Sequence, residues 1–181
     1  IVTVIAWQET NEVFDDALRA LHASISDGAF YQVNYTAQHV AQVHAVAGIA
    51  PQASDRALFA ALRRAQPGGY AARPALGDER VLSVSPELFF DWRPDANGAG
   101  PLLARPMKGT APRGATAVED AAQAQALRSA PKERAENVMI VDLLRNDMSR
   151  IAMPGSVQVP RLFDCEAWPT VWQMTSSIAA R

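Results

Sequence analysis

The chain has 181 residues, of which 49% are hydrophobic and 20% charged, a balance typical of a soluble globular protein that argues against disorder of the whole chain. Its 17 lysines and arginines against 19 acidic residues give a formal net charge of −2, so nothing points to binding of nucleic acid or of an anionic membrane surface. No apolar stretch is long enough to span a bilayer, and the single cysteine, Cys165, cannot form an internal disulfide, which favours a cytoplasmic protein.

The first part of the chain carries two strand patterns and two helix patterns. Residues 1–7 are rich in β-branched side chains and favour a strand, whereas apolar residues at 12–25 have the spacing of a helix. From 30 to 46 apolar and polar residues mostly alternate, which predicts a long strand with one polar face. A second helix is expected at 55–65.

Strands and a tight turn come next. We expect short strands at 69–73 and 80–84. Asp95-Ala96-Asn97-Gly98 is a strong turn signal, so the strands expected at 87–92 and 101–105 should pair as an antiparallel hairpin.

The remaining chain is expected to contain two helices and then strands. Residues 116–130 are rich in alanine with glutamate and glutamine, and Pro131 suits the first turn of a second helix at 131–147. Within that helix, 138–144 is apolar nearly all round, which predicts burial on more than one side. Two or three strands finish the chain, at 155–160, 161–166 and 170–179.

Helices and antiparallel strands occur in mixed order, without regular alternation of strand, helix and strand. This order favours an α+β fold over a doubly wound sheet. Because no repeat, low-complexity tract or flexible linker divides the chain, we expect residues 1–181 to form part of a single domain. The chain begins without a methionine, inside an expected strand, and stops without a terminating signal, so we expect that domain to be truncated at the C-terminus and also at the N-terminus.

The segment from Arg105 to Gly114 is the most unusual of the sequence, because three cations, two prolines and two glycines surround one threonine. Proline fixes the backbone, and glycine lets the backbone approach a ligand closely. Lys108 lies between Met107 and Gly109 at the end of a strand, where partial loss of hydration would free its amine to act as a nucleophile. The alternative is a basic surface loop after a hairpin, since lysines are mostly exposed.

A second segment, 85–90, places a carboxylate directly before apolar residues. Glu87 in apolar surroundings could hold a proton and donate it as a general acid. The alternative is that Glu87 stands at the start of a strand and points to water, as ordinary glutamates do.

The helix expected at 131–147 carries two acidic residues of interest. Asp142 lies in the apolar run and needs a cationic partner if it is buried. The arginines that could supply one are Arg113, Arg134 and Arg145. Glu136 shares one side of the helix with Ile140 and can face a cavity, where a carboxylate suits Mg²⁺, a hard cation that prefers oxygen ligands. One carboxylate is a weak metal signal by itself.

Several motifs occur in an order that resembles one family. They are Tyr31-Gln32-Val33-Asn34-Tyr35-Thr36, Ser85-Pro86-Glu87, the segment 105–114, the segment 134–147, Pro154-Gly155-Ser156-Val157 and Pro169-Thr170-Val171. From about residue 28 to the C-terminus the chain is similar to the chorismate-binding enzymes, which include anthranilate synthase component I, aminodeoxychorismate synthase component I, and the isochorismate and salicylate synthases. The resemblance implies layered antiparallel sheets flanked by helices, as in anthranilate synthase component I.

The residue at position 108 separates the subfamilies. Lysine is typical of aminodeoxychorismate synthase component I, whereas anthranilate and isochorismate synthases typically carry alanine there. The resemblance implies that Lys108 attacks the chorismate ring conjugately and expels the ring hydroxyl, and that ammonia then displaces the lysine and leaves an amino group in the hydroxyl's place. An amine nucleophile splits one hard substitution into two easier ones. Glu87 matches the family glutamate proposed as general acid on the departing hydroxyl.

The resemblance also implies the binding residues. Glu136 matches a family ligand of Mg²⁺, which clamps a chorismate carboxylate. Gly109 and Thr110 would line the substrate site, and Arg113 would help to hold the nearby loop. At Gln173 many relatives carry a histidine beside the substrate, which puts an acid–base role there in doubt. The family's C-terminal part, with a second Mg²⁺ glutamate, does not follow in this sequence.

The expected function is therefore amination of chorismate to 4-amino-4-deoxychorismate, on the way to p-aminobenzoate and folate, with ammonia supplied by a glutamine amidotransferase subunit or domain. With half of the metal site absent from the sequence, the 181-residue chain alone is expected to be inactive. Two alternatives remain open. One is anthranilate synthase component I, and the other is a non-catalytic chorismate-family binding domain.

Overall fold

The computed structural model describes residues 2–7, 11–37, 39–43 and 51–181, with side chains at 11–37 and 53–181. The chain divides into two compact units, Ile1–Arg56 and Ala57–Arg181. In the part of the chain that is described, each helix is too short or too polar to cross a lipid bilayer.

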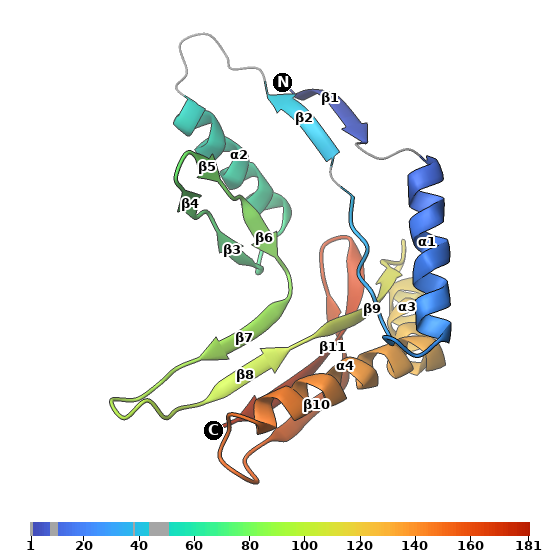
Figure 1. Cartoon of the computed structure of the whole chain (residues 1–181), viewed down its shortest axis with the longest axis vertical. Coiled ribbons are helices and arrows are strands. Elements are labelled where there is room, and N and C mark those ends of the chain that lie inside the picture. Colours follow the sequence, from blue (N-terminus) through green and yellow to red (C-terminus); the bar gives the residue numbers. More distant parts are fainter. Residues whose placement is uncertain (1, 8–10, 38, 44–50) are drawn as a thin grey trace. The chain divides into compact units, whose positions relative to one another are not determined.

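The first unit contains a two-stranded antiparallel sheet and a long helix. β1 (Val2–Trp7) pairs with β2 (His39–Val43), and α1 (Asn11–Ser26) lies between them in the sequence (Figure 1). Phe14 of α1 packs against Tyr35, with ring centroids 5.7 Å apart. The strand and the helix expected at the start of the chain are confirmed.

The long strand expected from 30 to 46 is present only in part. Strand pairing is confined to β2, and residues 30–37 form neither helix nor strand, so the prediction is wrong for them. Residue 38 and residues 44–46 lie outside the described residues. Alternation of side chains does not make a strand by itself, because the backbone also needs a neighbour to take its hydrogen bonds.

Short elements occupy residues 51 to 85. α2 (Pro51–Ala65) begins before the expected 55, and two small antiparallel pairs follow it (Figure 1). These pairs are β3 (Tyr70–Ala72) with β6 (Ser83–Ser85), and β4 (Ala75–Leu76) with β5 (Glu79–Arg80). The strands expected at 69–73 and 80–84 therefore enclose an additional hairpin.

A five-stranded antiparallel sheet is the centre of the second unit. Its strands are β7 (Leu88–Trp92), β8 (Leu102–Arg105), β9 (Met107–Pro112), β10 (Gln158–Ala167) and β11 (Val171–Ala180). β11 pairs with β10 along one edge, while its other edge pairs with β9 in its first half and with β8 in its second half. The expected hairpin of β7 and β8 is confirmed, and the Asp95 side chain accepts the Asn97 amide hydrogen at 2.8 Å in its turn.

Two helices cover one face of this sheet. α3 (Ala117–Ser129) begins with a capping box, in which the Thr116 hydroxyl accepts the Glu119 amide hydrogen and the Glu119 carboxylate accepts that of Thr116. α4 (Pro131–Ser149) has its proline in the first turn, as expected. Val141 and Met148 of α4 pack with Ala104, Ile178 and Ala180 of the sheet to form the core.

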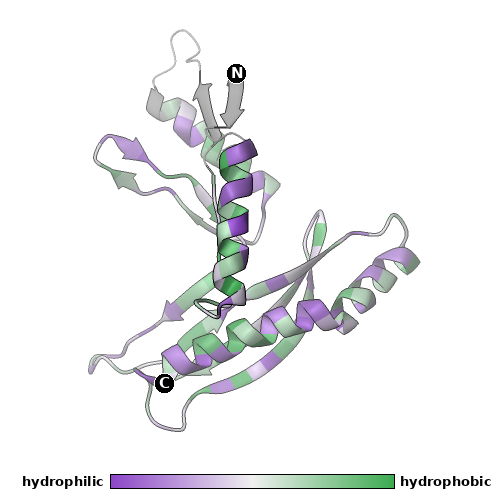
Figure 2. Ribbon diagram, turned by 45° about the vertical axis from the view of Figure 1, so that its right-hand side comes forward, coloured by the Kyte–Doolittle hydropathy of each residue, from purple (hydrophilic) through white to green (hydrophobic). Residues whose placement is uncertain are grey.

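The expectation that α4 is buried on more than one side is wrong for the second unit as described. Val138 and Leu143 are exposed, and hydrophilic and hydrophobic residues alternate along the helix (Figure 2). The sheet covers only one side of α4, where residues recur at a spacing of 3.6. The apolar residues on the opposite side are not covered by any element of this unit as described.

The strands expected at 155–160 and 161–166 merge into the single strand β10. Its register with β11 shifts between Gln158 and Asp164, and Phe163 has a φ of 61°. The Phe163 amide donates to the Ser176 hydroxyl at 3.1 Å, and the Arg134 guanidinium lies 4.6 Å from the centre of the Phe163 ring. These contacts hold an otherwise unfavourable backbone conformation.

Candidate active site

The segment expected to carry the chemistry is a strand rather than a loop. β9 runs from Met107 to Pro112 and pairs with the first half of β11, with Thr110 opposite Gln173 and Met107 opposite Thr175. The alternative of a basic surface loop is therefore wrong. Proline at both ends and glycine inside obscured the strand in the sequence, because both residues are depleted in strands.

A bulge in β9 lies at the expected nucleophile. Between the pairs Thr110–Gln173 and Met107–Thr175, two residues of β9, Lys108 and Gly109, stand opposite a single residue of β11. Bulges bend a strand locally and redirect a side chain. Lys108 is half-buried at this bulge, so it does not extend freely into solvent.

Gly109 makes the bulge possible. Its φ is +99°, a conformation that residues with a side chain rarely adopt. A Cβ atom there would lie 3.1 Å from Glu133 Oε2 and 3.3 Å from Leu127 Cδ1. The backbone next to Lys108 therefore presses directly against α3 and α4, and only glycine fits both the conformation and the space.

Glu87 is bound to the backbone next to the nucleophile. The loop between β6 and β7 carries Glu87, and its Oε1 accepts the Met107 amide hydrogen at 3.1 Å. The Ser85 hydroxyl accepts the Glu87 amide hydrogen at 3.2 Å, which fixes the turn. Glu87 is an exposed residue, but its carboxylate is held one residue away from Lys108 rather than free in water.

Thr110 and Gln173 form a pair across the strands. The Thr110 hydroxyl donates to Gln173 Oε1 at 3.0 Å. This contact uses the carbonyl of the glutamine side chain, which leaves its NH₂ group able to donate elsewhere. Gln173, where relatives are expected to carry histidine, thus positions Thr110 without a group that titrates near neutral pH.

Glu136 lies on α4 and is partly buried. It follows Glu133, the residue that touches Gly109, by less than one helical turn. Its Oε1 is 3.7 Å from the Lys132 amine.

Asp142, which was expected to need a partner, is exposed and accepts a hydrogen bond from Arg145 at 2.9 Å.

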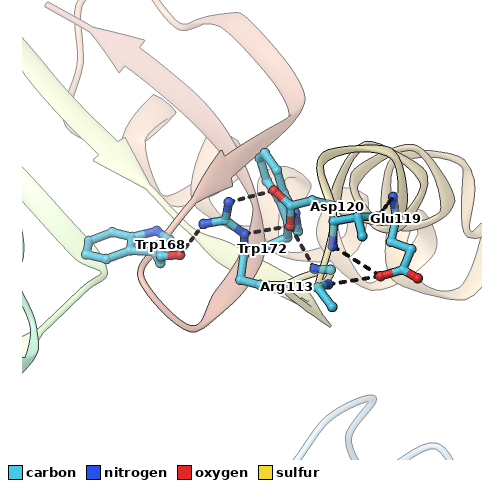
Figure 3. A network of polar contacts seen from close by, with 8 residues as sticks. Arg113, Glu119, Asp120, Trp168 and Trp172 are labelled. Carbon is cyan, nitrogen blue, oxygen red and sulfur yellow. Dashed lines mark hydrogen bonds and ion pairs between the residues drawn. The ribbon is translucent and has the colours of Figure 1, made fainter.

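Arg113 anchors the end of β9, as the resemblance implied. Its Nε and Nη2 donate to the two oxygens of Asp120, at 2.7 and 2.6 Å, and its Nη1 donates to the Trp168 carbonyl at 2.7 Å (Figure 3). The guanidinium carbon lies 4.9 Å from the centre of the Trp172 ring. The Arg113 side chain thereby ties together the end of β9, the start of α3 and the turn between β10 and β11.

Asp120 is the acceptor at the centre of this network. The Gly114 amide and Trp172 Nε1 each donate to its Oδ1, both at 2.9 Å. The hydrogen bonds from Arg113, and next that from the Gly114 amide, hold the pKa of the Asp120 carboxyl well below its usual range. Asp120 is therefore a permanent anion at any pH at which the enzyme would work.

Sequence reasoning missed Asp120, Glu133 and Glu166 as parts of the site. The pattern Thr116-Ala117-Val118-Glu119 was a capping-box signal that places the start of α3, and with it Asp120, directly after the Arg113 segment. Glu166 forms an ion pair with Arg105 across the sheet. No spacing in the sequence predicts that contact, because it depends on the pairing of β8 and β10 with β11.

Comparison with known proteins agrees with this arrangement. Residues 3–181 match the model of the chorismate binding enzyme family. Over 178 residues the chain is 39% identical to aminodeoxychorismate synthase component 1 of Klebsiella aerogenes, a match that covers 97% of this chain and 37% of that protein. It is 40% identical over 124 residues to anthranilate synthase component 1 of Aeropyrum pernix, covering 67% of this chain and 27% of that protein.

The fold agrees as well. The crystal structure of anthranilate synthase component I from Streptococcus pneumoniae TIGR4 superposes with a TM-score of 0.79 at 26% identity, covering 99% of this chain and 36% of that chain. The α+β architecture with antiparallel sheets flanked by helices is thus confirmed. The chain spans just over a third of the length of the K. aerogenes and S. pneumoniae proteins, and about a quarter of the A. pernix protein is matched. By the family match along nearly all of its residues, the chain belongs to the chorismate binding enzymes.

Proposed function

We propose that the full-length protein is an aminodeoxychorismate synthase component I, which converts chorismate and ammonia to 4-amino-4-deoxychorismate. The observation that carries this proposal is the half-buried Lys108 on the bulge of β9, with the Glu87 carboxylate bound to the adjacent Met107 amide. The similarity to aminodeoxychorismate synthase component 1 of K. aerogenes supports it. The product would serve p-aminobenzoate and folate synthesis.

Lys108 would act as the nucleophile. Its neutral amine attacks the chorismate ring, a C–N bond forms as the bond to the ring hydroxyl breaks, and one water leaves. Glu87 would supply the proton to the departing hydroxyl. With Oε1 held by the Met107 amide at 3.1 Å, the carboxyl group is oriented, and Oε2 has no hydrogen-bond partner among the described residues. Oε2 is therefore the oxygen that would carry the proton.

Ammonia would complete the exchange. It attacks the ring carbon that carried the hydroxyl, the new C–N bond forms as the ring double bonds shift and the bond to Lys108 breaks, and one proton passes from the attacking nitrogen to the lysine amine. Gly109 and Thr110 would line the substrate site, since both adjoin Lys108 on β9. Thr110 is already oriented through its hydrogen bond to Gln173.

Mg²⁺ would be held by Glu136. In the described part of the chain no group of three or more metal-ligating side chains gathers, and Glu136 is the carboxylate that the family resemblance assigns to the metal. Such a donor set still fits Mg²⁺, which commonly takes one or two carboxylates and fills its other positions with water and substrate oxygens. When bound, Mg²⁺ would offset the charge of a chorismate carboxylate. The Lys132 amine, 3.7 Å from Glu136 Oε1, is exposed and can move aside.

The proposal includes a partner and a compartment. We propose that a glutamine amidotransferase subunit or domain supplies the ammonia, which agrees with the name component 1 of the relatives. Residues 1–181 would be part of a single chorismate-binding domain. Because Cys165 is the only cysteine of the sequence, a reducing compartment such as the cytoplasm suits the protein.

Product identity tests the proposal. The full-length protein is incubated with chorismate, Mg²⁺ and ammonium, and the product is analysed by mass spectrometry. We expect aminodeoxychorismate, and we expect Lys108→Ala to form it at no more than about 1% of the wild-type rate, as for loss of an essential nucleophile. Anthranilate as the product would assign the protein to anthranilate synthase component I instead. Bound but unchanged chorismate would assign it to the non-catalytic alternative.

A further inference from the structure

A polar side chain holds the first half of α4 against the sheet. The buried residues of α4 are Asn137, Val141 and Met148, and the two apolar ones lie in its second half. Asn137 has no exposed surface and stands about one turn beyond Glu133, the residue that lies against Gly109 in the bulge. The turn of α4 nearest the bulge is therefore anchored by asparagine rather than by an apolar residue.

Hydrogen bonds link Asn137 to the strand of the expected nucleophile. Asn137 Oδ1 accepts the Ser176 hydroxyl hydrogen at 2.5 Å, and Ser176 also has no exposed surface. The Ser176 amide donates to the Pro106 carbonyl at 3.2 Å. Pro106 precedes Met107, whose amide donates to the Glu87 carboxylate at 3.1 Å. Through Ser176, Asn137 thus connects α4 to the backbone that carries the candidate site.

The other end of the Asn137 side chain has a structural cost. Its Nδ2 is buried and has no hydrogen-bond partner among the described residues. A buried donor without an acceptor destabilises the folded state, whereas leucine, with the same branching, would be buried without that cost. Asparagine supplies direction instead, because a hydrogen bond weakens steeply when it is bent, while apolar contact is non-directional.

We propose that Asn137 is a positioning residue that fixes the rotation of α4 and thereby the direction of the Glu136 carboxylate, an inference that rests on the proposed function. Glu136 directly precedes Asn137, and neighbouring residues of a helix are about 100° apart around its axis. A rotation of α4 by about 10° would move a carboxylate about 6 Å from that axis by about 1 Å. Mg²⁺ tolerates little displacement of a ligand, because it requires nearly ideal octahedral geometry at about 2.0–2.1 Å.

Binding of Mn²⁺, which accepts the same oxygen ligands as Mg²⁺, tests the proposal without relying on turnover. The full-length protein is titrated with Mn²⁺, and free Mn²⁺ is measured by electron paramagnetic resonance. Asn137→Leu removes the acceptor and keeps the branched shape. We expect its Kd for Mn²⁺ to rise about tenfold, as when a group that orients a metal ligand is lost. Glu136→Gln removes the carboxylate itself and gives the upper limit of the effect.

Val141→Ala is the matched control. Val141 is buried on the same side of α4, about one turn beyond Asn137, and its side chain is apolar. Its truncation should lower the midpoint of thermal unfolding, because it leaves a cavity in the core. The Kd for Mn²⁺ should nevertheless stay within about twofold of the wild type.

Several results would overturn the role of Asn137. One is an unchanged Kd in Asn137→Leu, and another is an equal rise in Val141→Ala, since lost stability alone would then explain both. If Asn137→Leu fails to fold, Ser176→Ala removes the other partner of the same hydrogen bond, and an unchanged Kd in that variant would be equally damaging. A wild-type protein that binds Mn²⁺ no better than Glu136→Gln removes the metal role of Glu136 in the proposed function. Tighter binding by the wild type, with Asn137→Leu unaffected, removes only the role of Asn137.

Discussion

Replacing Gly109 with alanine tests the bulge on which the candidate site is built. The φ of +99° costs a residue with a side chain about 1–2 kcal/mol. The new Cβ would also lie 3.1 Å from Glu133 Oε2 and 3.3 Å from Leu127 Cδ1, and overpacking of this kind costs about 1–3 kcal/mol. Gly109→Ala should therefore lower the free energy of unfolding by about 3 kcal/mol, or the midpoint of thermal unfolding by about 6–12 °C.

Gly155→Ala is the matched control for this prediction. Gly155 has a φ of +78° as well, but a Cβ there would meet nothing within 4 Å. Its substitution should cost only the backbone strain, about 1–2 kcal/mol. Thermal unfolding followed by circular dichroism, on both variants and the wild type, separates the two contributions. Equal destabilisation by the two substitutions would refute the close approach of α3 and α4 to the bulge.

Two further predictions concern buried polar contacts. Ser176→Ala should lower the free energy of unfolding by about 2–4 kcal/mol, because the buried Ser176 hydroxyl donates to Asn137 at 2.5 Å and accepts from the Phe163 amide. The control, Ser177→Ala on the next residue, should lower it by less than about 1 kcal/mol. Urea unfolding of both variants checks this prediction, and equal losses would contradict it. Asp120→Asn should destabilise the protein most near neutral pH. The pKa of the Asp120 carboxyl is lower in the folded state than in the unfolded state. The contribution of this carboxylate to the free energy of unfolding is therefore complete above its usual pKa near 4 and is lost as the pH falls through the lowered pKa. Unfolding midpoints measured from pH 7 down to pH 2 should differ by a constant gap above about pH 4 and by a narrowing gap below it. A gap that stays constant over the whole range would contradict the role of the carboxylate.

Local signals in the sequence were sufficient for much of the fold. The turn at 95–98 predicted the β7–β8 hairpin, and the proline at 131 predicted the break between α3 and α4. These features depend on residues that are close in sequence, where backbone preferences decide the outcome. The α+β class followed from the order of the elements.

Contacts between distant segments could not be predicted in this way. β9 was hidden by its prolines and glycine, and its strand character comes from pairing with β11 some sixty residues later. The apolar run of α4 suggested burial on several sides, although the sheet covers only one side. Periodicity reports which residues are apolar, but not how many neighbours will cover them.

The contrast between local signals and contacts of distant segments applies to the candidate site as well. Lys108, Glu87 and Thr110 were predicted from their motifs, and the structure adds that the Glu87 carboxylate binds the Met107 amide on the strand that carries the other two. The groups that hold them in place, such as Asp120 and Glu166, came only from the structure. Their side chains act across paired strands or between a strand and a helix, and no fixed spacing in the sequence marks such contacts.

Peptide mapping of the reacted protein tests the nucleophile most directly. The full-length protein is treated with chorismate and Mg²⁺ without ammonia, then digested and analysed by mass spectrometry. The sequence holds only two lysines, so Lys132 is an internal control for non-specific modification. We expect a mass increase of chorismate less one water on the peptide with Lys108 and none on the peptide with Lys132. An unmodified Lys108, together with normal aminodeoxychorismate formation by Lys108→Ala, would contradict the account.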